Sequence, residues 1–114
     1  MNIYDLLDEL LDQTNVEHDA IRLYVPDGEE SPETYITYAR YDENGVLQVD
    51  DVEKRTAIYV QVDVWSKKSP FKLAEQVKSI LKENGFNRRS VGDTYEHDTR
   101  LFRVYQRFYY AYNN

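Results

Sequence analysis

Two histidines are the first residues that metal or acid-base chemistry would use, and each lies in the same tripeptide. The two copies are Glu17-His18-Asp19 and Glu96-His97-Asp98. Imidazole and carboxylate groups ligate transition metals, but adjacent residues of an extended segment point to opposite sides. One tripeptide therefore cannot close around an ion, and a metal site would need both segments to meet. We expect solvated polar loops at both places and no metal ligands.

Other catalytic motifs are missing from the sequence. The four glycines are isolated at positions that fit turns and helix ends, so there is no glycine-rich loop for phosphate. The five serines lie outside nucleophile-elbow contexts, and there is no cysteine. Asp50 and Asp51, close to Glu53, fit a charged solvated loop better than acid-base catalysis, because carboxylate pairs are unavoidable in so acidic a chain. We expect neither an enzyme nor a cofactor.

Asp63 has a more informative position than the other acidic residues, because it interrupts an otherwise apolar strand pattern on the face that also carries Trp65. Arg103 or Arg107 of the last predicted strand could pair with it across the sheet. We interpret Asp63 as half of a structural ion pair rather than as a catalytic acid.

Aromatic and arginine side chains are predicted to gather on that same sheet face. Trp, Tyr and Arg dominate the hot spots of protein interfaces, so the face is a candidate contact surface for another protein. A half-solvated face covered by the N-terminal helix would explain the same residues. The candidates are Tyr59, Trp65, Arg103, Tyr105, Arg107 and Tyr109.

Charge is distributed unevenly along the 114 residues. Residues 1–53 carry 15 acids and two bases, a net charge of −13, whereas residues 54–114 carry 12 bases and six acids, a net charge of +6. Copies could dock acid to base in a head-to-tail contact that closes into a ring, or the two surfaces could neutralise each other within one monomer. The charged candidates are Asp50, Asp51, Glu53, Lys67, Lys68, Arg88 and Arg89.

The overall composition sets the broad class. A net charge of −7 disfavours a protein that reads nucleic acid, and no stretch approaches the ~20 apolar residues of a membrane span. Residues 1–11 have acids where a signal peptide would have bases. We expect a soluble cytoplasmic protein with a single domain over residues 1–114.

Hydrophobic periodicity predicts two helices and two hairpins. The helices are expected over 3–13 and 70–84, the strands over 34–41, 56–66, 86–91 and 99–112, with a break at Gly92-Asp93 and a short edge strand suggested at 21–25. In the long strands, Ile58, Val60, Val62, Val64, Phe102, Val104, Phe108 and Tyr110 are expected to face the core.

The order of these elements favours an α+β fold. Hairpins pair antiparallel, and two amphipathic helices need a sheet to cover. We predict a four-stranded, mainly antiparallel sheet with two amphipathic helices, in the order α-β-β-α-β-β. Residues 42–54 form a flexible acidic segment in this interpretation.

Several segments together resemble a known family. They are the run Tyr35-Ile36-Thr37-Tyr38, the strand from Val60 to Ser66, the helix from Pro70 to Asn84 with Gly85-Phe86, and the closing run Asp98 to Arg103. This pattern is similar to the tail terminator, or tail-completion, proteins of long-tailed bacteriophages and prophages. The resemblance spans about residues 1–112.

The resemblance implies a structural role. Members are small α/β folds that form a hexameric ring on the last ring of the tail tube, halt its growth and present a surface to the head connector. The expected partners are therefore other copies of the chain, the major tail tube protein, and a head connector or head-completion protein. The family has no catalytic residues to transfer. Its flexible segment would correspond to residues 42–54, and its location is the host cytoplasm during assembly and then the head-tail junction of the virion.

Three alternatives stay open at this point. Head-tail adaptor or head-completion neck proteins share the size and phage origin. An acidic protein-interaction module outside phages would be a monomer with a basic partner. An enzyme using the acidic loop and both histidine segments would hold metal near stoichiometric occupancy.

The acidic segment generates a first prediction. Replacing Asp50 and Asp51 together with lysine should weaken association between subunits, and more strongly at low salt because ions screen exposed charges. Sedimentation velocity under ring-forming conditions checks this. Unchanged sedimentation of the double variant would contradict it.

Overall fold

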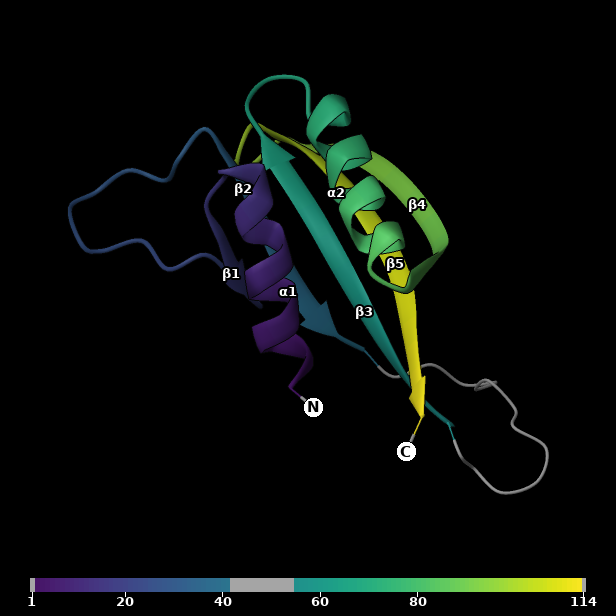
Figure 1. Cartoon of the computed structure of the whole chain (residues 1–114). Helices are drawn as coiled ribbons and strands as arrows, with labels where there is room; N and C mark the ends of the chain where they lie inside the picture. Colours follow the sequence, from purple (N-terminus) through teal and green to yellow (C-terminus); the bar gives the residue numbers. More distant parts are fainter. Residues whose placement is uncertain (1, 42–54, 114) are drawn as a thin grey trace.

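A computed structural model describes residues 2–41 and 55–113 of the chain. Within these residues two α-helices lie on the same side of a five-stranded sheet (Figure 1). The helices are α1 (Ile3–Leu11), followed by the 3-10 turn η1 (Asp12–Thr14), and α2 (Phe71–Glu83). The strands are β1 (His18–Ala20), β2 (Thr34–Arg40), β3 (Arg55–Ser66), β4 (Phe86–Glu96) and β5 (Leu101–Asn113).

The sheet has the order β1-β2-β3-β5-β4, with β3 in the centre. β1 pairs parallel with β2, and the other three pairings are antiparallel. The α+β class is confirmed. The predicted four-stranded sheet in the order α-β-β-α-β-β is wrong, because the described sheet is mixed and contains β1 as a fifth, parallel strand at its edge.

β1 was not predicted, because it is short and polar. The three residues His18–Ala20 have no alternation of apolar side chains, and their pairing with β2 is what makes them a strand. The strand suggested at 21–25 is wrong for a local reason. Ile21 has a φ of 70°, a left-handed conformation that a β-branched residue rarely adopts and that cannot continue an extended chain.

One hydrophobic core fills the space between the helices and the sheet. As predicted, Ile58, Val60, Val62 and Val64 of β3 are all buried on one face. The apolar stripes of the two helices pack against them. Each Å² of apolar surface that this packing removes from water stabilises the fold by about 25 cal/mol. The helix residues are Ile3, Leu7, Leu10 and Leu11 of α1 and Ala74, Val77, Ile80 and Leu81 of α2.

Local signals define the helix ends. Asn2 caps α1, since its side-chain oxygen accepts hydrogen bonds from the backbone N–H groups of Tyr4 (2.9 Å) and Asp5 (3.3 Å). α2 begins at Phe71, directly after Pro70, and ends before Gly85. Gly85 has a φ of 94°, the left-handed conformation that closes many helices.

β4 and β5 differ from prediction in two places. The break expected at Gly92-Asp93 is wrong, because β4 continues through Gly92 to Glu96 with one irregularity between Arg88 and Ser90. Gly92 fits the strand because the ring of Tyr105, its partner on β5, lies across it where a Cβ would collide. This arrangement shields the backbone of an edge-strand glycine with an aromatic ring.

On β5, Phe102 was expected to face the core but is 39% exposed. Val104 and Phe108 are buried as predicted. Gln106 is the core residue that the apolar pattern missed. Its side chain donates to the backbone carbonyl of Ala74 (3.0 Å) and accepts from Arg88 (3.2 Å), so both ends of the amide are hydrogen-bonded. A buried glutamine without these partners would be costly.

The predicted acidic segment 42–54 lies outside the described residues. Among residues 2–41 and 55–113, neither helix is both long and apolar enough to cross a membrane.

Tyr38 gives the fold a dependence on alkaline pH. Its side chain is buried and its hydroxyl donates to Asp8 (3.4 Å). Burial first, and then the negative charges of Asp8, Asp19 and Asp12, raise the pKa of this phenol above its usual value of about 10. Below pH 10 the phenol is protonated in both the folded and the unfolded chain. Above pH 10 only the unfolded chain releases the proton, so stability falls as pH rises.

We therefore expect the free energy of unfolding to fall by roughly 1 kcal/mol in total between pH 9 and pH 11 for this group. Tyr38→Phe should reduce that fall, as measured by urea denaturation at both pH values. Tyr24→Phe is the matched control, because Tyr24 is 71% exposed. Identical pH dependence in wild type and Tyr38→Phe would contradict the prediction.

Candidate assembly surface

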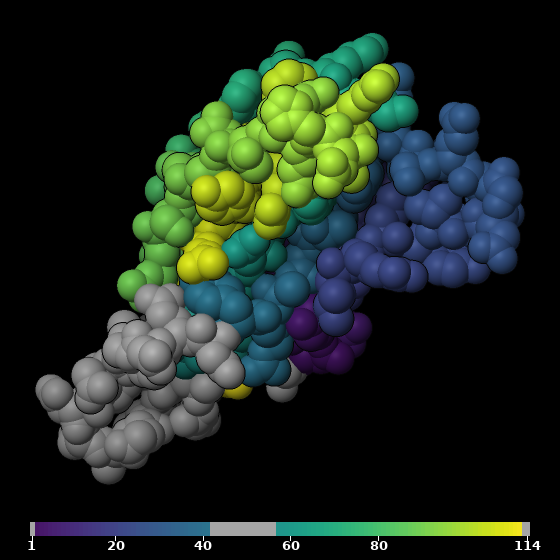
Figure 2. Space-filling model, turned by 180° about the vertical axis from the view of Figure 1, so that it is seen from behind, coloured from purple at the N-terminus to yellow at the C-terminus, as the bar shows by residue number. Residues whose placement is uncertain are grey.

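The sheet face opposite the helices is formed by side chains of β2, β3 and β5, with Arg89 of β4 beside them over the Tyr59 ring. In the described residues neither helix covers it, and the strands lie at the surface when the molecule is viewed from behind (Figure 2). We call this surface the open face. It contains most of the aromatic and arginine residues that the sequence predicted to lie together, and a buried acid lies at its centre.

Asp63 and Arg103 form the central ion pair of the open face. The Oδ2 atom of Asp63 accepts from Nη2 (2.7 Å) and Nε (3.0 Å) of Arg103, and its other oxygen accepts from the Gln61 amide (3.0 Å). The side chain of Asp63 is 10% exposed and that of Arg103 is 27% exposed. The interpretation of Asp63 as half of a structural ion pair is therefore confirmed, with Arg103 rather than Arg107 as its partner.

A layer of aromatic rings surrounds that ion pair. The guanidinium of Arg103 lies 4.9 Å from the centre of the Trp65 ring and 5.3 Å from that of Tyr105. Trp65 stacks on Tyr35 at 5.9 Å and donates its indole N–H to Thr37 (3.0 Å). Cation–π contacts of this kind contribute about 0.5–2 kcal/mol each, so the guanidinium is held by charge, hydrogen bonds and stacking together.

A second cluster lies further along the same strands. Arg107 is exposed, lies 4.8 Å from the centre of the Tyr41 ring, and donates to the neutral side chain of Gln61 (3.0 Å). Arg89 lies 5.7 Å from the ring of Tyr59, which also contacts Tyr41 and Tyr109. The open face thus carries three arginines, each lying over at least one aromatic ring.

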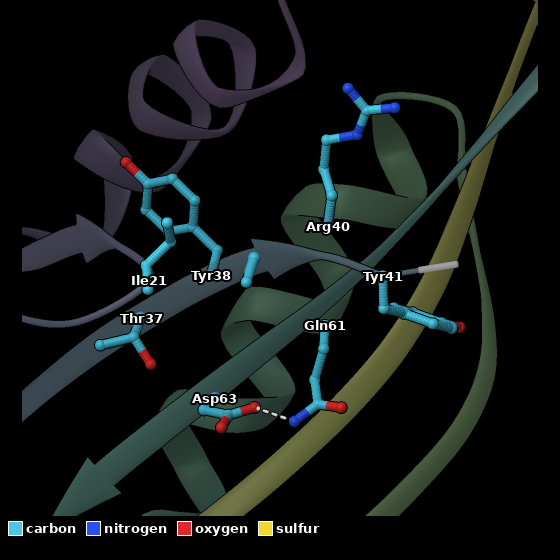
Figure 3. A pocket seen from close by; sticks show the side chains of 8 residues that line it. Ile21, Thr37, Tyr38, Arg40, Tyr41, Gln61 and Asp63 are labelled. Carbon is cyan, nitrogen blue, oxygen red and sulfur yellow. Dashed lines mark hydrogen bonds between the residues drawn. The ribbon is translucent and has the colours of Figure 1, made fainter. Parts of the chain in front are cut away.

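A cavity of about 190 Å³ opens beside β2, near Asp63 (Figure 3). Thr37, Gln61 and Asp63 supply polar side chains to its lining, and Ile21 contributes an apolar one. Ligand pockets for drug-sized molecules have volumes of about 300–1,000 Å³, so this cavity is small for such a ligand. The open face is better suited to contact another protein.

The structure brings part of the predicted interface together. Trp65, Arg103, Tyr105 and Arg107 lie on the open face. Tyr59 lies there too, but it is buried beneath its neighbours with an exposed fraction of 6%.

Other predicted residues lie elsewhere. Lys67 and Lys68 follow the end of β3, where the Lys68 ammonium is 3.9 Å from Glu33 of the same chain. Arg88 and Arg89 are adjacent at the irregularity of β4, but Arg88 contacts Gln106 on the helix-covered side. Asp50, Asp51 and Glu53 lie outside the described residues.

Three members of the open face were missed at the sequence level. Tyr35 belongs to β2, Tyr41 directly follows its last residue, and Gln61 lies on β3, where its amide donates to Asp63. The register of β2 against β3 places Tyr35 opposite Trp65, which alternation alone does not give. Burial, and then the negative charge of Glu96, raises the pKa of the Tyr35 phenol, which keeps this stacked ring uncharged.

The family model described as "Tail completion protein gp17" matches residues 7–113, which is nearly the whole chain. No curated protein matches the chain.

The ion pair generates a prediction about stability. Arg103→Ala should destabilise the protein by about 2–4 kcal/mol, because it leaves the buried Asp63 carboxylate without a counter-charge. Arg107→Ala is the matched control and should cost less than about 1 kcal/mol, since Arg107 is exposed and its polar partner is neutral. Urea denaturation measures both values. Equal losses for the two variants would show that the ion pair does not stabilise the open face.

Proposed function

The chain belongs to the family of tail completion protein gp17, a family of phage tail structural proteins, and we propose that it forms a ring that caps the tail tube. The ring would be hexameric, would stop the tube from growing and would join the tail to the head connector. The family match over residues 7–113 is the observation that carries this proposal. The protein would act by binding rather than by catalysis.

The open face supplies a surface suited to such assembly. Aromatic and arginine side chains that are held in place before binding lose little freedom on contact, which favours their use as interface anchors. Trp65, Arg103 and Tyr105 are held in this way by stacking and by Asp63. We infer that a neighbouring copy docks on this face.

An acidic edge of the same fold provides the complementary surface. Residues 2–33 carry ten acids and one base, a net charge of −9. Within them, the segment between β1 and β2 extends away from the sheet (Figure 1). Glu29 and Glu30 of this segment are exposed, as is Arg107 on the open face. We name the segment of residues 21–33 the acidic loop.

Contact between the acidic loop of one copy and the open face of the next is heterologous. Such contacts use two different surfaces, so a row of copies always has one unoccupied surface at each end. The row stops growing only when these two surfaces meet and close a ring. Six weak contacts with the tube end, made at once by such a ring, give an avidity that a single copy lacks. Growth would stop because the far side of the ring offers no site for another tube subunit.

A charge-swap experiment tests the subunit contact. Arg107→Glu should weaken self-association at least tenfold in sedimentation velocity, since it places like charges opposite each other. Replacing Glu29 and Glu30 with lysine in the same chain should restore much of the association. Lys82→Glu, an exposed change on α2, is the control and should leave association unchanged.

The measurement needs a condition in which the wild-type chain forms rings, and growing tail tubes supply one. Electron microscopy of tubes assembled with the wild-type chain should show added density at one end and a halt in elongation. Normal assembly of the Arg107→Glu variant would contradict the subunit contact. Wild-type rings that bind a head connector but leave tubes bare would contradict capping and identify a head-tail adaptor.

A further inference from the structure

His18, Asp8 and Asp12 converge at the C-terminal end of α1, on a part of the chain that the open face does not use. The His18 Nε2 atom is 3.0 Å from an oxygen of each carboxylate. One ligand atom from each of the three residues lies within 4.8 Å of the other two. The two aspartates are four residues apart, so they project from the same side of the helix. Together the three residues line an open depression of about 560 Å³.

The histidine is positioned as a metal ligand would be. Its side chain is only 9% exposed, and Nδ1 lies 2.8 Å from the backbone carbonyl of Val16. A ring held by that contact carries its proton on Nδ1, so in the neutral ring Nε2 presents its lone pair. Nε2 faces two carboxylate oxygens and the backbone carbonyl of Asp8 at 3.1 Å. Every one of these neighbours is a hydrogen-bond acceptor, so a lone pair on Nε2 is satisfied either by a proton or by a metal ion held between the nitrogen and the carboxylates.

The surrounding charges favour a cation as well. α1 has no basic residue in its last turn, so the negative end of its dipole adds to the two carboxylates. Asp8 and Asp12 are 61% and 69% exposed, which leaves their remaining oxygens open to water. One buried nitrogen ligand and two accessible oxygen ligands form an open site that solvent can complete.

We propose that His18, Asp8 and Asp12 bind a divalent first-row transition metal such as Zn²⁺, with water in the remaining positions. An imidazole ligand favours Zn²⁺ over Mg²⁺ and Ca²⁺, which select sites built from oxygen alone. The bound ion would tie the first residue of β1 to the end of α1. This inference does not depend on the proposed ring.

The chain contains its own matched control. His97 lies in the second Glu-His-Asp tripeptide, is exposed and contacts the Tyr95 ring. It is not part of the metal-ligating group found among the described residues. His18→Gln and His97→Gln therefore make the same change in the same tripeptide. Only His18 lies next to the carboxylates of Asp8 and Asp12. Asp12→Asn adds a change at an exposed position, where failure to fold is not expected.

Calorimetric titration of the full chain, without a histidine tag, with ZnCl₂ tests the site. We expect one Zn²⁺ per chain and a higher thermal midpoint when the ion is present, since a ligand that binds the folded state stabilises it. Affinity should fall ~10-fold or more in His18→Gln and in Asp12→Asn, stay unchanged in His97→Gln, and be at least tenfold weaker for MgCl₂. In NMR spectra, Zn²⁺ should shift the ring signals of His18 and not those of His97.

Three results would overturn the proposal. The first is no binding of Zn²⁺ by the wild-type chain, which would mean that a proton alone bridges the histidine and the carboxylates. The second is binding that survives His18→Gln. The third is a loss of affinity as large in His97→Gln as in His18→Gln.

Discussion

Asp63 lies on the central strand, and its charge must be neutralised because its side chain is buried. A carboxylate removed from water is costly unless it is paired and hydrogen-bonded, and Arg103 and Gln61 supply those contacts here. To reach Asp63, the Arg103 side chain crosses diagonally from β5, since Trp65 and not Asp63 is its direct partner in the register. The guanidinium therefore lies over Trp65, and one ion pair fixes the orientation of the surrounding rings.

The two faces of the sheet have different roles in the protein. The helix-covered face buries the apolar residues of β3 and β5 and provides the driving force for folding. The open face is held by polar and aromatic contacts, which contribute less to stability but leave a rigid and specific surface. The proposed ring would need both properties, because each copy would have to fold and then recognise the next.

Regular, long-range patterns could be predicted from the sequence, and features set by a tertiary partner could not. The alternation of β3 and the stripes of both helices predicted the core correctly. β1 was missed because its pairing with β2, rather than its composition, makes it a strand. Gly92 was assigned to a break because the ring of Tyr105 that shields it belongs to another strand. Gln106 was overlooked because only its bonds to Ala74 and Arg88 make its burial favourable.

The candidate site shows the same division. Alternation predicted Trp65, Arg103, Tyr105 and Arg107 on one face, and Asp63 was expected to find an arginine there. Neither Tyr35 nor the separation of Arg88 from Arg89 could be foreseen, since both depend on register and on an irregularity in β4. The contact between His18 and α1 was not predicted either. The prediction considered a metal site only where the two histidine segments would meet each other, and not where one of them meets the helix.

Cross-linking between copies tests the central claim most directly, because the natural chain has no cysteine. Glu29→Cys and Arg107→Cys in one chain would place a thiol on the acidic loop and another on the open face. Under mild oxidation during assembly on tail tubes, the double variant should give a ladder of disulfide-linked species up to a closed ring, whereas each single variant should stay uncross-linked. Dimers from either single variant, or no ladder from the double variant, would contradict the head-to-tail contact.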